Sequence, residues 1–320
     1  LSWALYLILA FNFPNRPACQ NAFKTFFVHR VGDVSFLFGI FLTYKYFGTL
    51  EFADLFKAAA EQPQMISFFS GDFKISAVTV ISLLIFVGAM AKSAQFPLHV
   101  WLPDTMDSPT PVSALMHAGI INAGGFLLNR LAPFYVLSPN TLHIVFMIGL
   151  LTVLMGASMM LAQNDIKKTL GFSTMAQMGY MIMECGLGAF ALAIFHLIAH
   201  GLFKATLFLG AGKGIHAARE EPKLPESNSH PPPSSLSQLS FFTGLTLTLI
   251  IPLIILLVAH GVLNIHLQDA HGAVILLFFA WVTASQVMFS LFRLHDVASW
   301  KVAGTMIVAL FFIGFIYLWA

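Results

Sequence analysis

Three basic side chains recur at every fourth position of one apolar stretch: His196, His200 and Lys204 in AIFHLIAHGLFKATLFLGAG. On a helix they lie on one face, about 6 Å apart along the axis, and apolar side chains cover the rest. Histidine titrates near neutral pH, and a desolvated lysine gives up its proton more easily, so the row has the chemistry of a water-bridged proton relay. Two alternatives stay open: a metal site at the two histidines, which lacks a carboxylate or thiol on the same helix, and a purely structural polar seam.

A further buried cation is predicted at Lys92, which follows a long uncharged run in LLIFVGAMAKSAQFP. An uncompensated charge at the centre of a bilayer costs at least about 2.5–3.5 kcal/mol, so an ionisable residue there indicates a function and a partner. The alternative is a lysine that snorkels from a helix end to the lipid headgroups, since Pro97 follows closely.

Asp33 is a candidate partner for two different cations. It follows Arg30 by three residues in FFVHRVGDVSFLFG, and the two can pair on one helix face in a neutral, structural arrangement. Alternatively Asp33 reaches Lys92 on a neighbouring helix. An opposite charge within about 4–6 Å favours the protonated lysine, so withdrawal of the carboxylate would release a proton. The sequence leaves both pairings open.

Other ionisable residues extend the set of candidates. His117 lies among small residues that permit close helix packing, and it is either a relay member or a hydrogen-bonded core histidine. Asp165, Lys167 and Lys168 stand at a helix junction, where an ordinary cytoplasmic turn accounts for Lys168 better than for Lys167. Glu184 is another candidate acid, near a predicted helix end.

The composition indicates a membrane protein that carries no cofactor of its own. Hydrophobic residues make up 58% of the 320 residues and charged residues only 9%, against roughly 25% charged in soluble domains. A formal net charge of +2 gives no basic patch for nucleic acid. Cys19 and Cys185 suggest neither a disulfide framework nor a zinc site. Because flavin, nucleotide and iron–sulfur motifs do not occur in the sequence, any redox chemistry would belong to other subunits.

Long apolar runs predict the elements that position these side chains. A membrane-spanning helix needs about 20 apolar residues, whereas barrel strands would be half as long and alternate in polarity. The runs lie at about 1–11, 26–48, 75–96, 111–133, 140–163, 173–187, 189–216, 240–264, 272–292 and 299–320. We therefore predict an all-α, polytopic integral membrane bundle of about nine or ten transmembrane helices. The first run is expected to be the tail of a helix that begins before Leu1.

Two segments interrupt this pattern. FPLHVWLPDTMDSPTP, at 96–111, carries four prolines and two aspartates between apolar runs. Proline breaks a helix, and at membrane depth such a break is tolerated only against protein or a water-filled cavity, so we predict a discontinuous helix, with a surface loop as the alternative. Residues 217–239 are rich in proline and serine and predict a solvated linker, which divides residues 1–216 from the C-terminal helices of 240–320.

Four segments resemble the antiporter-like membrane subunits of respiratory complex I, in particular the chain 5 type. They are HRVGD (29–33), AKSAQFPLHVWLPDTMDSPTPVSALMHA (91–118), NDIKKTLGFSTMAQMGYM (164–181) and FHLIAHGLFKATLFL (195–209). The string MHAGIINAGGFLLNR (116–130) looks most like the DabB subfamily, the membrane subunits of bacterial inorganic carbon transporters. The resemblance covers about residues 1–216 and implies an antiporter-like, proton-translocating domain there.

The resemblance implies a role for each matching residue. Lys92 would be the broken-helix lysine that carries the proton centrally. His117 would follow it, and Lys167 would be the bridging lysine. His196, His200 and Lys204 would form the connecting relay. Asp33, with Arg30, would lie near the ion-pair region that couples neighbouring half-channels. The family's glutamate partner of the broken-helix lysine would lie upstream of Leu1.

Two departures from the complex I pattern favour the carbon-transporter subfamily. The runs at 240–264 and 272–292 contain no lysine or glutamate for an exit half-channel and offer only His260, His266 and His271 near their ends. This sequence ends soon after Trp319, where the complex I pattern is expected to continue into a long lateral helix.

The resemblance also implies partners and a location. For the carbon-transporter subfamily the implied partner is a DabA-like, zinc-binding subunit similar to carbonic anhydrases, in a bacterial inner membrane. The alternatives are the other membrane subunits and quinone-reducing arm of complex I, or a multisubunit cation/proton antiporter. The basic loop near 12–25 would face the cytoplasm by the positive-inside bias.

Overall fold

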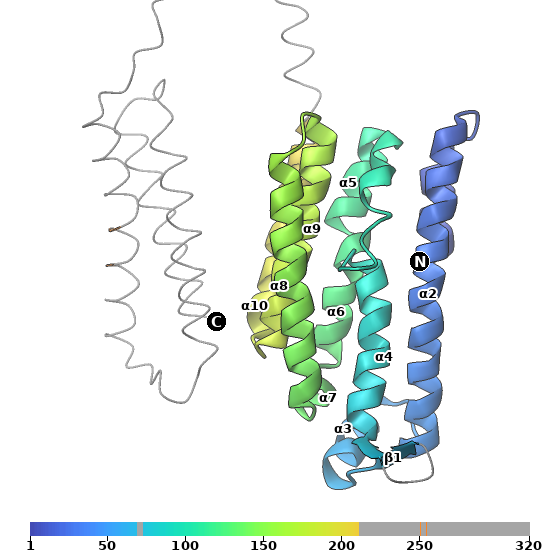
Figure 1. Ribbon diagram of the computed structural model, residues 1–320, viewed down its shortest axis with the longest axis vertical. Helices are drawn as coiled ribbons and strands as arrows, with labels where there is room; N and C mark the ends of the chain where they lie inside the picture. Colours follow the sequence, from blue (N-terminus) through green and yellow to red (C-terminus); the bar gives the residue numbers. More distant parts are fainter. Residues whose placement is uncertain (69–72, 211–249, 251–253, 255–320) are drawn as a thin grey trace, which may run out of the picture. The chain divides into compact units, whose positions relative to one another are not determined.

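The computed structural model describes residues 1–68, 73–210, 250 and 254 of the chain (Figure 1). The chain divides into two compact units, Leu1–Glu221 and Pro222–Ala320. The predicted linker at 217–239 lies outside the described residues. The predicted C-terminal helices and His260, His266 and His271 also lie outside them, apart from Ile250 and Ile254.

Helices make up nearly all of the described part of the first unit. Their bounds are α1 (Ser2–Leu9), η1 (Ala10–Asn12), α2 (Arg16–Phe47), α3 (Phe52–Glu61), α4 (Ala77–Lys92), η3 (Pro103–Asp107), α5 (Thr110–Ala118), η4 (Ile120–Asn122), α6 (Ala123–Arg130), α7 (Ala132–Val136), α8 (Pro139–Leu161), α9 (Ile166–Gly186) and α10 (Phe190–Gly210). Within the described residues, four helical stretches are long and apolar enough to cross a membrane: Arg16–Phe47, Thr110–Arg130, Pro139–Leu161 and Phe190–Gly210. The prediction of a polytopic, all-α membrane bundle is confirmed.

Two boundaries and one small sheet differ from the sequence prediction. α2 begins at Arg16 rather than near 26, because Pro17 stands in its first turn, where the missing N–H costs nothing. α9 begins at Ile166 rather than near 173, and the Asp165 carboxylate caps it by accepting a hydrogen bond from the Lys168 backbone nitrogen at 2.9 Å. Between α3 and α4 the chain forms an antiparallel hairpin of β1 (Met65–Phe68) and β2 (Phe73–Ser76), which the sequence analysis did not predict.

The proline-rich segment interrupts the helices as predicted, and much of it packs inside the protein. α4 ends at Lys92, and an α-helix resumes only at Thr110; η4 then separates α5 from α6. Trp101 in this segment is fully buried, and its indole N–H donates a hydrogen bond to the Ala91 carbonyl at 3.0 Å. The alternative of a surface loop is therefore wrong, since the broken backbone packs against protein.

Small residues bring the helices of the bundle close together. α2 packs on α4, α4 on α6, α8 on α9, and α9 on α10 (Figure 1). A Cβ atom added to Gly179 of α9 would lie 2.8 Å from the Val153 backbone nitrogen on α8, and one added to Gly149 would lie 2.6 Å from the Met183 nitrogen. Glycine at these positions allows the two backbones to touch.

The α8–α9 contact gives a prediction for stability. Gly179→Ala is expected to lower the free energy of unfolding by about 1–3 kcal/mol, because the new methyl group meets backbone that cannot rotate away. Thermal unfolding of the protein in detergent measures the change. Gly210→Ala, where an added Cβ meets nothing within 4 Å, is the matched control and should unfold like the wild type. Equal midpoints for the two variants would contradict the close packing.

Candidate functional site

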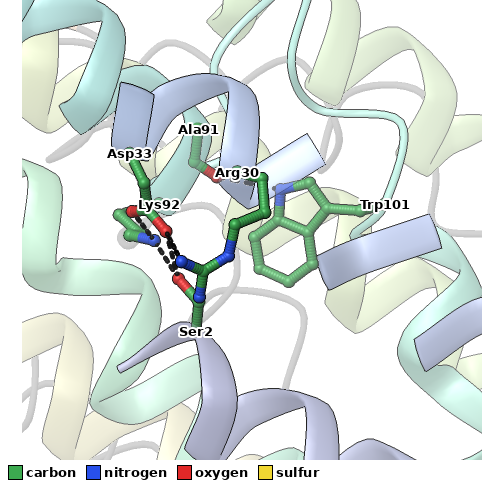
Figure 2. Close-up of polar contacts among 6 residues, drawn as sticks. All are labelled: Ser2, Arg30, Asp33, Ala91, Lys92 and Trp101. Atoms are coloured by element: carbon green, nitrogen blue, oxygen red, sulfur yellow. Dashed lines mark hydrogen bonds and ion pairs between the residues drawn. The ribbon is translucent and has the colours of Figure 1, made fainter. Parts of the chain in front are cut away.

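The last residue of α4 meets a carboxylate of α2. The Lys92 Nζ lies 2.7 Å from Asp33 Oδ1, and the two side chains are 15% and 25% exposed. This contact exists because α2 and α4 pack through glycine: a Cβ on Gly32 would collide with the Ala91 side chain, and one on Gly88 would lie 2.9 Å from the Phe36 Cβ. The Lys92 ammonium is thus directed to Asp33 (Figure 2).

Two more side chains complete this ion-pair cluster, defined as Ser2, Arg30, Asp33 and Lys92. The Ser2 hydroxyl donates to Asp33 Oδ2 at 2.9 Å and accepts a hydrogen bond from the Lys92 ammonium. The Arg30 Nη1 lies 3.5 Å from Asp33 Oδ2, and its guanidinium stacks 4.6 Å from the centre of the Phe26 ring. Both pairings that the sequence left open are therefore made at once, and Asp33 is shared by two cations.

A second group of ionisable residues lies where α9 and α10 pack. The Lys204 ammonium is buried and donates hydrogen bonds to the Ser173 hydroxyl at 2.9 Å and the Leu170 carbonyl at 3.3 Å. His200, one turn earlier, is buried, and neither ring nitrogen has a hydrogen-bond partner within the described residues. Among residues 1–68 and 73–210, Lys204 therefore has neutral partners only, while His200 retains a free donor and a free acceptor.

His196 continues this row to a buried acid. Its Nδ1 lies 3.1 Å from Glu184 Oε2 and its Nε2 lies 3.0 Å from Gln177 Oε1, while its ring centre is 6.2 Å from that of His200. Glu184 is 2% exposed. From the sequence, Glu184 was a candidate acid with no assigned partner. In the structure, the turn between α9 and α10 brings His196 next to it. Both nitrogens of His196 are thus engaged, which disfavours a metal site at His196 and His200.

His117 joins the same group from α5. It is fully buried, its ring stacks on Phe208 of α10 with centres 4.5 Å apart, and both of its nitrogens lack partners within the described residues. α5 approaches α10 through Gly201, where a Cβ would lie 2.8 Å from the Ala118 carbonyl oxygen. The relay group is defined as His117, Glu184, His196, His200 and Lys204.

Lys167 stands apart from the relay group. Its ammonium donates to the Ser108 carbonyl at 3.2 Å, so it ties the first turn of α9 to the proline-rich segment. Lys168 is exposed. Within residues 1–68 and 73–210, no direct hydrogen bond joins the ion-pair cluster to the relay group.

Water is the natural link across the unpartnered atoms. A buried polar group without a hydrogen bond costs about 1–3 kcal/mol, and polar interior sites of this kind hold water that bonds such groups. His117 and His200 present two such atoms each. With water between them, these imidazoles and the Lys204 ammonium would have the chemistry of a proton relay.

The Glu184–His196 contact gives a testable consequence. Glu184→Gln is expected to slow proton transfer about tenfold, because the amide keeps a hydrogen bond to His196 but cannot accept a proton. Proton flux into liposomes containing the protein and its partner subunits is the measurement. Glu61→Gln, an exposed acid at the end of α3, is the matched control. An unchanged flux in the Glu184 variant would place Glu184 in a structural role only.

Comparison with known proteins agrees with the fold. Residues 1–280 match the family described as "NADH:quinone oxidoreductase/Mrp antiporter, TM". The chain is 48% identical to the probable inorganic carbon transporter subunit DabB1 of Halothiobacillus neapolitanus. The alignment spans 291 residues, which cover 89% of this chain and 51% of that protein. It is 49% identical over 217 residues to the chloroplastic NAD(P)H-quinone oxidoreductase subunit 5 of Phaseolus vulgaris, covering 66% of this chain and 28% of that one.

A solved structure supports the architecture. The chain matches a chain of the membrane-bound sulfane sulfur reductase, an archaeal respiratory membrane complex, with a TM-score of 0.59 and 21% identity, over 99% of this chain and 58% of that chain. This likeness shows the fold. The chain spans about half the length of the DabB1 relative and less of subunit 5. The resemblance predicted from the four sequence segments is confirmed, and the chain belongs to the membrane-spanning family of NADH:quinone oxidoreductase/Mrp antiporter subunits.

Proposed function

We propose that this chain is the proton-conducting membrane subunit of an energy-coupled inorganic carbon transporter. The observation that carries the proposal is the row on α10, where Lys204 follows His200 and His196 on one helix face and meets only neutral partners in the described part of the chain. Lysine without a counter-charge in a buried site can lose and regain its proton, which is the property that a relay needs. Proton flow would power the uptake or hydration of carbon dioxide by a partner subunit.

The ion-pair cluster would couple this relay to its neighbours. While Asp33 holds Lys92 at 2.7 Å, the lysine keeps its proton. Withdrawal of the carboxylate toward Arg30, which already lies 3.5 Å from it, would leave Lys92 without its counter-charge and release the proton. His117 and Lys167 would carry it onward to the α10 row, with water between the side chains.

The similarity to DabB1 favours the carbon-transporter assignment. It extends over 291 residues, whereas the similarity to chloroplastic subunit 5 extends over 217 at nearly the same identity. The partner that this assignment implies is a DabA-like, zinc-binding subunit similar to carbonic anhydrases, in a bacterial inner membrane. Zinc would belong to that partner, and this chain would carry no cofactor. The two-histidine motif of α10 would then serve protons rather than a metal.

A second candidate function is the proton-pumping chain 5 subunit of an NADH–quinone oxidoreductase. The observation that favours it is the identity of 46–49% to several chloroplastic subunit 5 proteins over 213–220 residues. In that case the neighbours would be respiratory membrane subunits and a quinone-reducing arm. The site chemistry is the same, so only the partner distinguishes the two.

Growth rescue with identified partners tests the proposal. The full-length protein and the product of its neighbouring gene are expressed together in a strain without carbonic anhydrase, which grows only at high carbon dioxide. Growth in air, with co-purification of a zinc-binding partner, is the expected result. Failure to rescue, with respiratory subunits in the purified complex, would overturn the carbon-transporter assignment in favour of the second candidate.

A further inference from the structure

His29 lies on α2 one turn before Asp33 and is fully buried. Neither of its ring nitrogens has a hydrogen-bond partner within the described residues. A neutral imidazole carries one donor and one acceptor, and leaving such groups unpaired in the interior costs about 1–3 kcal/mol each. Buried polar groups of this kind are satisfied by internal water. Internal water bonded to the ring would satisfy both nitrogens of His29.

The environment of His29 matches that of the two relay histidines. In the part of the chain that the structure describes, the histidines buried with both ring nitrogens unpartnered are His29, His117 and His200. His117 and His200 belong to the relay group of α5, α9 and α10. His29 has the same burial and the same free atoms, but it stands beside the ion-pair cluster on α2.

Trp101 closes one side of the His29 site. The two rings meet edge to face, with centres 4.6 Å apart and an interplanar angle of 85°. The indole N–H cannot serve His29, because it donates to the carbonyl of Ala91, the residue before Lys92. Trp101 thus fixes the proline-rich segment to the end of α4 and leaves the imidazole nitrogens to water.

A polar row on α2 leads from His29 to a pocket. Asn21, Thr25, His29 and Asp33 recur every fourth residue, so they follow one helix face in steps of about 6 Å. At the end of this row lies a small pocket whose lining is part polar and part apolar: Asn21, Asp104, Thr105 and Ser108 with Leu9, Ala18 and Ala22. At the same end, Lys24 and Asp104 form an ion pair of 2.6 Å between side chains that are 48% and 35% exposed.

We propose that His29 is a proton-relay residue which, with internal water, joins the pocket at Asp104 to the Lys92–Asp33 ion pair. The proposal rests on the proton-conducting role proposed above. Water on one side gives a proton to one ring nitrogen, and the other nitrogen gives its own proton to water on the opposite side. One proton has then moved, and the imidazole remains neutral in its other tautomer. No oxidant or second reactant is needed.

Hydration of the site is tested without any transport assay. Radiolysis in ¹⁸O-labelled water marks side chains that contact ordered internal water. In the full-length complex, Trp101 is expected to take up the label although it is fully buried, and His29→Phe is expected to remove it. Tyr135 is the matched control, because it is equally buried and its hydroxyl is bonded to the Ser82 carbonyl at 3.0 Å. An unlabelled Trp101 in the wild type would overturn the proposal.

The relay step is tested by proton flux into liposomes. His29→Phe and His29→Gln are both expected to lower the flux at least about tenfold, although glutamine, which still bonds water, should keep the Trp101 label. His143→Phe, an exposed histidine of α8, is the control and should conduct like the wild type. Wild-type flux in both His29 variants would overturn the relay step. If Lys92→Met also conducted normally, the proposed proton-conducting function itself would fail. The labelling of Trp101 would still show, independently of flux, whether water lies beside His29.

Discussion

Lys204→Met is expected to lower proton flux by at least about 100-fold while the complex still assembles. Methionine has a similar length and fills the space of the buried lysine, so the packing of α9 on α10 is largely kept. What it removes is the amine that meets the Ser173 hydroxyl and the Leu170 carbonyl. Flux is measured with a pH-sensitive dye inside liposomes that contain the full-length chain and its partners.

Lys204→Arg separates charge from proton transfer at the same position. Arginine keeps a positive charge but is never deprotonated in proteins, so a relay role predicts that this variant is as inactive as methionine. Lys168→Met, an exposed lysine of the neighbouring helix, is the matched control. Normal flux in Lys204→Arg would show that the site needs only a fixed charge and would remove Lys204 from the relay.

Local periodicity explains why the α10 row could be predicted from sequence. His196, His200 and Lys204 are four residues apart, and any helix through them places them on one face. The structure adds what periodicity cannot supply, which is the partner of each: Glu184 and Gln177 for His196 come from α9. A hydrogen bond between helices depends on their rotation and separation, and a single helical pattern contains neither.

The ion-pair cluster also depends on contacts between helices that the sequence pattern does not specify. The sequence offered Arg30 and Lys92 as alternative partners of Asp33, because the first lies on the same helix and the second depends on how α2 meets α4. Gly32 of α2 and Gly88 of α4 allow the two helices to pack closely, since each leaves room for the facing helix. Ser2 was not anticipated at all, because nothing in the sequence of a first helical turn indicates that its hydroxyl reaches two residues far along the chain.

The proline break was predictable because proline acts on its own backbone. Four prolines within 96–111 exclude a continuous helix whatever surrounds them. Whether the broken segment lay at the surface depended on Trp101, whose burial and hydrogen bond to Ala91 are tertiary facts. The sequence did not single out His29 for a related reason: its spacing to Asp33 was visible, but its burial was not.

Asp33→Asn is expected to destabilise the protein by about 2–3 kcal/mol, because it leaves the Lys92 ammonium in a mostly buried site without its carboxylate. Lys92→Met is expected to cost less, since Asp33 would keep the Arg30 guanidinium and the Ser2 hydroxyl. The double variant should recover most of the stability lost by Asp33→Asn, because the mostly buried ammonium is gone and the Arg30 side chain, which also loses Asp33, is 41% exposed. Chemical or thermal unfolding of the purified protein gives these three free energies.

Proton flux should follow a different order, and this difference identifies the cluster as part of the transport machinery. Lys92→Met and the double variant are both expected to lose at least about 99% of the flux, even though the double variant is nearly as stable as the wild type. For comparison of stability alone, Asp104→Asn breaks the exposed pair with Lys24 and should cost less than about 1 kcal/mol. If the double variant regained flux together with stability, the Asp33–Lys92 pair would be a structural clamp, and proton release on withdrawal of the carboxylate would be refuted.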